Sequence, residues 1–400
     1  MAIDTLLDEA QDLQSEAVRL RRTLHAHPEV GLDLPFTQAR VLEELDGLPL
    51  SIETGTSTTS VVATLEGASP GPTILLRGDM DALPMHEDTG LDFGSTIDET
   101  MHACGHDLHT TMLVNAARLL AARREDLAGS VRFMFQPGEE GHHGARYMLD
   151  EGLLDAPDDR PITGAFALHV FSVLPAGLIA LKGGAQMASA DQFRIIVHGK
   201  GGHASSPHHA LDPVPIACEI VQALQLFVTR KIDVFDPGLI TVARISAGTT
   251  FNVIPEEAEL YGTMRAVSDR TRMKLRDGLA RVAEGIAAAH DTTATVELDP
   301  GYPVTVNDDA YAGFVHAVAF DLLGDGSVVK MPNPVLGAED FSYVLERVPG
   351  AMAFLGAAPK GVDPWTAPPN HSNRVEFDED VMARGSALYA AVALRHLGSG

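Results

Sequence analysis

The chain has 400 residues, more than one compact hydrophobic core usually covers, so we expect two domains. Hydrophobic residues make up 45% and charged residues 21% of the sequence, which is typical of globular proteins and excludes a disordered or fibrous chain. The 55 acidic and 29 basic residues give a net charge of −26, which excludes nucleic acid and anionic membranes as expected partners.

The N-terminal segment and the cysteines bear on the expected compartment. The first residues carry early acidic side chains and lack the apolar stretch of a signal peptide, and no run of 18 apolar residues predicts a membrane span. Two cysteines, Cys104 and Cys218, are too few for a disulfide framework. The sequence therefore predicts a soluble, cytoplasmic protein.

The two ends of the chain alternate between helical and strand-like patterns. A helix is expected over 6–26, ending at the His27–Pro28 step, because a residue before proline avoids the helical conformation. Strands are expected at 60–65, 73–76, 131–135, 165–168 and 351–355, and helices at 108–123 and 378–397. Nearly continuous apolar strands alternating with helices indicate an α/β fold with a buried, mostly parallel sheet.

The middle of the chain has a different order of elements. Strands are expected at 192–197, 239–245, 258–264 and 293–298, and helices at 213–228 and 270–289, with Cys218 in the apolar face of the first helix. This β-α-β-β-α-β order is that of a small ferredoxin-like domain. We therefore expect an inserted domain at 187–300, with the α/β domain built from 1–186 and 301–400.

Polar side chains follow three of the strands of the expected α/β sheet. Asp79 and Asp81 come just after strand 73–76, Glu139 and Glu140 after strand 131–135, and His169 at the end of strand 165–168. In open α/β sheets the active site lies outside the carboxyl ends of the strands. The three groups therefore predict a single site.

A cysteine and a histidine stand two residues apart just before the helix at 108–123. In MHACGHDLHT, Cys104 offers a thiolate and His106 an imidazole, a pair close enough to bind around one metal and better suited to zinc than to magnesium. The alternative is a small buried cysteine followed by polar residues at a helix start. His102 and His109 are not needed as ligands.

The remaining candidates have a simple structural alternative. Adjacent glutamates usually form a solvated acidic turn. After an apolar strand and beside the Cys-His pair, however, one carboxylate of Glu139 and Glu140 can bind metal while the other takes a proton from water. His142 and His143 are expected on the surface. His371, in PPNHSNRVEF, is a lone loop histidine of a kind that is more often structural than a ligand.

Nine motifs, collinear along the chain, resemble the aminoacylase/carboxypeptidase-G superfamily of dinuclear metallopeptidases. They are LHAHPEVG (24–31), RGDMDALP (77–84), MHACGHDLHT (101–110), QPGEEG (136–141), ALHV (167–170), GGHASSPHHALDPV (201–214), GTTFNVIPEEAEL (248–260), GAEDFS (337–342) and NHS (370–372). Within the superfamily the chain is most similar to the amidohydrolase branch, which includes hippurate hydrolases and indole-acetyl-amino-acid hydrolases.

The resemblance implies a role for each candidate residue. Two divalent ions are expected, with zinc or manganese preferred and cobalt or nickel as further candidates. Their ligands would be Cys104, which would bridge the two ions, together with His106, Glu140, His169 and His371. Glu139 is implied as the general base and acid. In the inserted domain, His203, Asn252 and Arg265 are implied as substrate contacts, with His203 bonding the developing oxyanion.

One motif departs from the wider superfamily. A ligating histidine is usual two residues before the aspartate of RGDMD, and here Asp79 takes its place. Asp79 and Asp81 are therefore expected to orient ligands and not to bind metal.

The reaction implied is hydrolysis of an N-acyl amino acid, hippurate-like or N-acetyl, to a carboxylic acid and a free amino acid. Alternatives are a dipeptidase or carboxypeptidase on the same metals, a metal-free cysteine amidase using Cys104 with His106, and a non-catalytic binder that kept the fold. The resemblance also implies a homodimer through the inserted domain, which would serve as a lid, with His203 reaching the neighbouring subunit's site.

Overall fold

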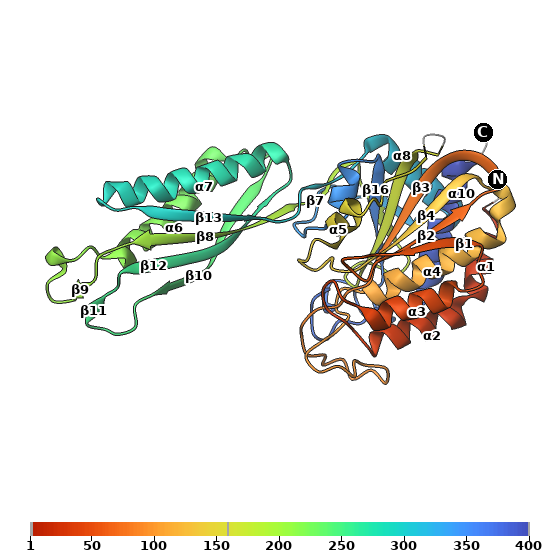
Figure 1. Cartoon of the computed structure of the whole chain (residues 1–400), viewed down its shortest axis with the longest axis horizontal. Coiled ribbons are helices and arrows are strands. Elements are labelled where there is room, and N and C mark those ends of the chain that lie inside the picture. Colours follow the sequence, from red (N-terminus) through yellow and green to blue (C-terminus); the bar gives the residue numbers. More distant parts are fainter. Residues whose placement is uncertain (1–2, 158–159, 399–400) are drawn as a thin grey trace. The chain divides into compact units, whose positions relative to one another are not determined.

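The computed structural model describes residues 3–157 and 160–398, which form two compact units (Figure 1). The first unit comprises Met1–Gln186, Val306–Asn333 and Asp340–Gly400, and the second comprises Met187–Thr305 and Pro334–Glu339. Each unit has a separate hydrophobic core. The second unit thus interrupts the chain of the first, and a short later segment also joins it.

An eight-stranded sheet forms the centre of the first unit. Its strands, in spatial order, are β1 (Leu50–Thr54), β2 (Val61–Glu66), β4 (Ala128–Gln136), β3 (Ser69–Asp79), β5 (Ile162–Phe171), β16 (Gly350–Gly356), β6 (Ile179–Leu181) and β15 (Val328–Lys330). Strands β4, β3, β5 and β16 run parallel to one another, whereas β1 and β2 pair antiparallel with their neighbours. Strand β6 is antiparallel to β16 and parallel to β15. The predicted α/β fold with a mostly parallel sheet is confirmed.

Helices of the first unit cover this sheet. They are α1 (Leu6–Asp12), α2 (Gln14–His25), α3 (Pro35–Leu45), α4 (His106–Ala122), α5 (Gly144–Asp150), α8 (Asp309–Leu323), α9 (Ser342–Leu345) and α10 (Val381–Leu397). The single helix expected over 6–26 is divided at Leu13, which keeps helical angles of φ −82° and ψ −4°. None of the helices in the described part of the chain combines the length and the apolar composition that a membrane span requires.

Helix α4 is buried on nearly all sides, packed on the sheet beside α10 and against α2. A helix in such a position is normally apolar all round. The first turns of α4 nevertheless bury polar side chains, among them His106, Asp107 and His109. Buried polar groups need partners, so this end of α4 is the place where a functional site is expected.

The second unit is a four-stranded antiparallel sheet covered by two helices. The spatial order is β10 (Gly238–Ala247), β12 (Glu257–Ala266), β8 (Ser189–His198) and β13 (Ala294–Pro300). Helices α6 (Pro213–Lys231) and α7 (Asp269–Ala289) bury their apolar faces against alternate residues of these strands. A short strand pair, β9 (Gly202–His203) with β11 (Val253–Ile254), lies outside this sheet. A second pair, β7 (Gly184–Met187) with β14 (Thr305–Asn307), falls where the chain leaves and re-enters the first unit.

The prediction of a buried Cys218 is wrong. Helix α6 buries Ile216, Ile220 and Leu224, whereas Cys218 is exposed. Successive residues of a helix turn by about 100°, so a residue two positions from Ile216 and from Ile220 points to the opposite face. Cys218 is therefore a surface thiol within an otherwise apolar segment.

Candidate metal centre

The carboxyl ends of β3, β4 and β5 meet the start of α4 at one edge of the large sheet. Residue Gly105 precedes α4 with a φ of 85°, in the left-handed region that favours glycine. A Cβ atom at this position would lie 2.3 Å from Cγ2 of Val170 on β5. The glycine of the Cys-Gly-His motif therefore lets Cys104 and His106 approach the end of β5 closely.

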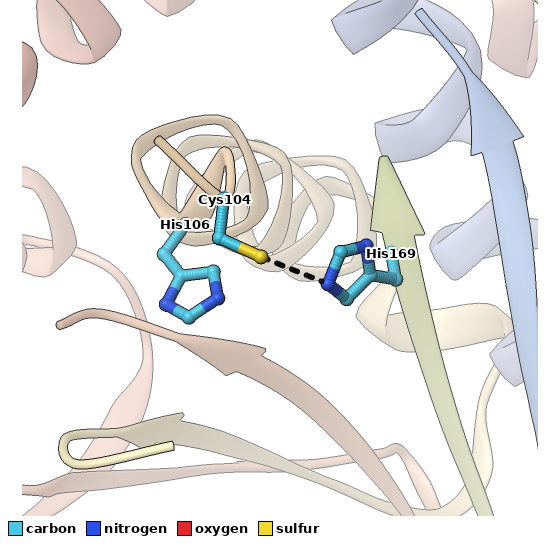
Figure 2. Close-up of side chains that lie close together, drawn as sticks. All are labelled: Cys104, His106 and His169. Carbon is cyan, nitrogen blue, oxygen red and sulfur yellow. Dashed lines mark hydrogen bonds between the residues drawn. The ribbon is translucent and has the colours of Figure 1, made fainter. Parts of the chain in front are cut away.

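Cys104 lies at the centre of the cluster. Its sulfur is 3.4 Å from Nε2 of His169 and 3.3 Å from Nε2 of His371. The ligand atoms of Cys104, His106 and His169 lie within 4.8 Å of one another (Figure 2), and so do those of Cys104, Glu140 and His371. The five side chains predicted as ligands are thus brought together in two groups that share the cysteine.

His106 is fully buried, and its ring fits a bound cation. Among the described residues, neither of its ring nitrogens has a hydrogen-bond partner. Carboxylate oxygens of Asp79, Asp81 and Glu140 lie 3.4–3.9 Å from these nitrogens, without hydrogen-bond geometry. Burial disfavours the charged ring, but the negative charge of Asp79 and a contact with Asp81 raise the pKa of His106 well above its usual value. The surroundings therefore favour positive charge at this point, as a metal ion supplies.

His169 presents a nitrogen lone pair to the cluster. Its Nδ1 donates a hydrogen bond to the carbonyl oxygen of Val170, at 2.8 Å. The proton of the neutral ring is therefore on Nδ1, and Nε2 faces Cys104 without a proton (Figure 2). Burial lowers the pKa of His169 well below its usual value, so its ring is neutral and the Nε2 lone pair is available.

His371 is brought in by a strained loop. Its φ is 69°, unusual for a residue other than glycine, and its backbone N–H donates to the carbonyl oxygen of Ala103. Its Nε2 lies 3.1 Å from Oε1 of Glu140. Contacts with Cys104 and Glu140 raise the pKa of His371 to about 10. This loop histidine is therefore part of the cluster, although its side chain is 53% exposed.

The loop after β4 holds the adjacent glutamates against the cluster. Asp81 accepts hydrogen bonds from the backbone N–H groups of Glu139 and Glu140, at 2.9 and 3.0 Å. Carboxylate oxygens of both glutamates lie within 4.8 Å of His106 and of each other. Glu139 is 5% exposed, so the alternative of a solvated acidic turn is wrong. Burial opposes the charge of Glu140, but His371 and His106 lower the pKa of its carboxyl.

The two histidines set aside from the ligand set have other surroundings. His109 donates from Nδ1 to Asp79 at 2.6 Å and accepts at Nε2 from the backbone N–H of Val170 at 2.8 Å. Both of its nitrogens are thus occupied. His102 is also fully buried, and burial lowers its pKa to about 3.

His142 and His143, which follow the adjacent glutamates in the chain, were both expected on the surface. His142 is exposed, whereas His143 is half-buried and its Nδ1 lies 2.9 Å from the hydroxyl of Tyr343. His143 therefore meets the expectation only in part, because it precedes α5 with a φ of 58° and packs beside Tyr343.

A buried arginine cluster that the sequence analysis missed lies beneath the site. The guanidinium of Arg77 contacts Asp79 and donates to Gln136 at 2.9 Å and to Asp340 at 3.3 Å. Gln136 in turn donates to Asp340 at 2.7 Å. A fully buried cation requires such partners. The available signal was an arginine inside the apolar strand ILLRGD.

The three predicted substrate contacts lie in the second unit. His203 of β9 and Asn252 lie close together, since His203 pairs with Val253 of β11, and both are exposed. Nδ1 of His203 accepts the backbone N–H of Ser205 at 3.0 Å, so the proton of the neutral ring is on Nε2. Arg265 lies on β12, partly buried, and burial lowers its pKa. His203 is thus a ready hydrogen-bond donor at the surface of its own unit.

Comparisons with known proteins agree with this geometry. The model of peptidase family M20/M25/M40 matches residues 75–395. Thermostable carboxypeptidase 1 of Saccharolobus solfataricus is 36% identical over 98% of this chain and 98% of its own. N-acetylcysteine deacetylase of Bacillus subtilis is 36% identical over 94% of this chain and 96% of its own. IAA-amino acid hydrolase ILR1-like 4 of Arabidopsis thaliana is 37% identical over 95% of this chain and 85% of its own.

One solved structure that is similar to this chain is described as a metal-binding protein. The Bacillus subtilis YXEP protein, described as a dinuclear metal-binding peptidase from the M20 family, has a TM-score of 0.82 at 33% identity, over 97% of this chain and 99% of that one. Together with the two ligand groups around Cys104, this likeness supports divalent metal ions as the cofactor.

Proposed function

Since the chain belongs to peptidase family M20/M25/M40 and is a metal-dependent amide hydrolase, we propose that it hydrolyses N-acyl amino acids to a carboxylic acid and a free amino acid. The observation that carries the proposal is the position of Glu139. This buried carboxylate lies beside His106 and Glu140, at the edge of the cluster formed by the five proposed ligands. A carboxylate in that position can act on a proton instead of a metal.

Two divalent ions fit the cluster, with Cys104 shared between them. One ion would be held by Cys104, His106 and His169, and the other by Cys104, Glu140 and His371. Sulfur, imidazole and carboxylate donors suit zinc or manganese, with cobalt or nickel as further candidates. When bound, such ions would polarise the acyl carbonyl and lower the pKa of bound water toward neutral pH.

The chain's own residues supply the proton transfers and the orientation. Glu139 takes the proton of the attacking water and passes it to the leaving nitrogen. Nε2–H of His203 would donate to the developing oxyanion, an interaction worth about 3 kcal/mol in other enzymes. Asn252 and Arg265, also on the second unit, are proposed to contact the substrate.

The activities for which the relatives are named support this substrate class. An N-acetylcysteine deacetylase and an IAA-amino acid hydrolase both cleave an acyl group from an amino acid. The test compares N-acetyl, N-benzoyl and indole-acetyl amino acids with free-amine dipeptides, using apoprotein reloaded with zinc, manganese, cobalt or nickel. We expect turnover of the N-acyl amino acids only, with two equivalents of metal per chain by elemental analysis. Full activity in a strong chelator would refute the metal mechanism.

A carboxypeptidase is the second candidate, because two relatives carry that name. It predicts faster release of a C-terminal amino acid from peptides than from N-acyl amino acids. A metal-free cysteine amidase using Cys104 with His106 predicts activity that survives a strong chelator and is lost on alkylation of the thiol.

We also propose a homodimer formed through the second unit, in which His203 serves the partner's site. Mixing inactive His203→Ala and Glu139→Ala proteins, with subunit exchange verified by mass, should restore activity through one intact composite site. Verified exchange without recovery would instead assign His203 to the site of its own chain.

A further inference from the structure

The backbone of Val170 is a junction of hydrogen bonds at the end of β5. Pairing between β3 and β5 ends at Ala167, so β3 no longer supports the last residues of β5. Beyond that point, the N–H of Val170 donates to Nε2 of His109 at 2.8 Å. Its carbonyl oxygen accepts from Nδ1 of His169 at 2.8 Å and from the side-chain amide of Asn370 at 2.9 Å. His109 therefore takes the place that a neighbouring strand would occupy.

The orientation of the His109 ring is itself determined. Its Nδ1 donates to Asp79 at 2.6 Å, and Asp79 is held in turn by Arg77. All three side chains are fully buried. A carboxylate accepts only, so the proton of His109 must be on Nδ1 and its Nε2 must be an acceptor. This is the form that the N–H of Val170 requires.

We propose that His109 is a positioning residue for the predicted ligand His169. By holding the backbone of Val170, it places the carbonyl oxygen that keeps the proton of His169 on Nδ1 and leaves Nε2 free for a metal ion. This proposal rests on the proposed metal-dependent function. It gives a role to a histidine that is not itself a ligand, because both of its nitrogens already have partners.

The geometry separates this role from simple packing. The rings of His109 and His169 lie 4.7 Å apart, centre to centre, so filling space alone would need only a group of similar size. Positioning needs an acceptor at the site of Nε2. A glutamine amide oxygen can reach that place, whereas an asparagine amide reaches only the place of Nδ1 and can bond Asp79 alone.

The test uses His109→Gln, His109→Asn and His109→Ala, with Thr111→Val as the matched control. Thr111 is equally buried on α4, and its hydroxyl donates to the carbonyl oxygen of Asp107, away from Val170. The first readout is the ¹⁵N spectrum of the imidazoles in apoprotein, which reports the tautomer of His169 without any metal. The second is titration with Co²⁺, followed by its thiolate absorption band at Cys104.

In wild type, Thr111→Val and His109→Gln, we expect His169 to carry its proton on Nδ1. We also expect the Co²⁺ affinities of these three proteins to lie within about threefold of one another. In His109→Asn and His109→Ala, we expect a mixture of tautomers and Co²⁺ affinity reduced by about 10–100-fold. Equal effects of the Gln and Asn variants, or a wild-type tautomer and affinity in His109→Ala, would overturn the proposal. If the Ala variant does not fold, the Gln–Asn comparison decides alone. Wild-type protein that takes up no Co²⁺ would refute the proposed function, while the apoprotein spectra would still decide the role of His109.

Discussion

The carboxylate of Asp81 accepts the backbone N–H of Glu140 at 3.0 Å, which ties the segment just after β3 to the loop after β4. Its other oxygen accepts the N–H of Glu139 at 2.9 Å and lies 3.4 Å from Nδ1 of His106. One buried carboxylate thus fixes the proposed base and faces a proposed ligand. This agrees with its expected role as an orienting residue and not as a ligand.

The substitution Asp81→Asn tests that relationship. An asparagine amide offers one oxygen, so one of the two N–H groups loses its acceptor and faces the amide NH₂ group instead. We expect metal affinity and kcat/KM to fall about 10–100-fold while the protein remains folded. Equilibrium dialysis and steady-state kinetics provide the measurements. Asp277→Asn, at an exposed position on α7, is the control, and a kcat/KM for Asp81→Asn within about threefold of it would contradict the role.

The adjacent glutamates should separate into two phenotypes. Glu139→Gln removes a proton acceptor but no proposed ligand, so we expect kcat to fall about 10²–10⁴-fold with metal content unchanged. Glu140→Gln removes a proposed ligand, so metal content should fall together with the rate. Elemental analysis beside kinetics distinguishes them. A Glu139→Gln enzyme that keeps more than about a tenth of the wild-type kcat is incompatible with the base assignment.

Local sequence patterns predicted the edge of the sheet at which the site lies. Asp81, Glu139 and His169 each follow an apolar strand, and parallel strands direct their carboxyl ends to the same edge. Local pattern left two readings open for Cys104 and His371, however, and only the resemblance favoured ligation. Their proximity depends on a chain separation of 267 residues, which no local pattern contains.

The parts that sequence analysis missed depend on distant contacts. Arg77 stands in an apolar strand, but its partners Gln136 and Asp340 are 59 and 263 residues away. Cys218 shows the opposite error, since an apolar segment was taken as uniformly buried although one face of α6 is exposed. Burial of a single side chain depends on the packed helix face and not on the composition of its neighbours.

The exposure of Cys218 determines how ligation by Cys104 is tested. Alkylation should be followed in a Cys218→Ser background, because the exposed thiol would otherwise react in both forms. A metal-bound Cys104 should be protected, and removal of the metals should make it reactive. Burial raises the pKa of the free Cys104 thiol. The alkylation rate of Cys104 in apoprotein should therefore continue to increase with pH beyond the range in which an ordinary thiol is already ionised. Equal rates by mass spectrometry, with and without metal, would count against ligation.

A half-buried carboxylate beside His25, Glu87, should make stability depend on pH. It accepts hydrogen bonds from the Thr89 hydroxyl and the backbone N–H of Ser95, and it lies 3.3 Å from Nε2 of His25. Burial opposes its charge, but His25, Thr89 and Ser95 together lower the pKa of Glu87 from 4.5 to about 2. A carboxyl whose pKa is lower in the folded protein than in the unfolded chain stabilises the fold at pH values above the unfolded-state pKa. This stabilisation is lost as the pH falls toward the folded-state pKa.

The free energy of unfolding of Glu87→Gln should therefore be about 1–2 kcal/mol lower than that of wild type at pH 7. This figure allows for solvent screening, because Glu87 is only partly buried. The difference should shrink between about pH 5 and pH 2, because wild type loses the contribution that the variant never had. The contribution of His25 has the opposite sign: burial opposes its charge, but Asp107 and Glu87 raise its pKa, so it is lost as pH rises. Urea denaturation followed by far-ultraviolet circular dichroism at several pH values measures the difference, with exposed Glu125→Gln as the control. A deficit as large at pH 2.5 as at pH 7 would show that the loop depends on the shape of the Glu87 side chain and not on its charge.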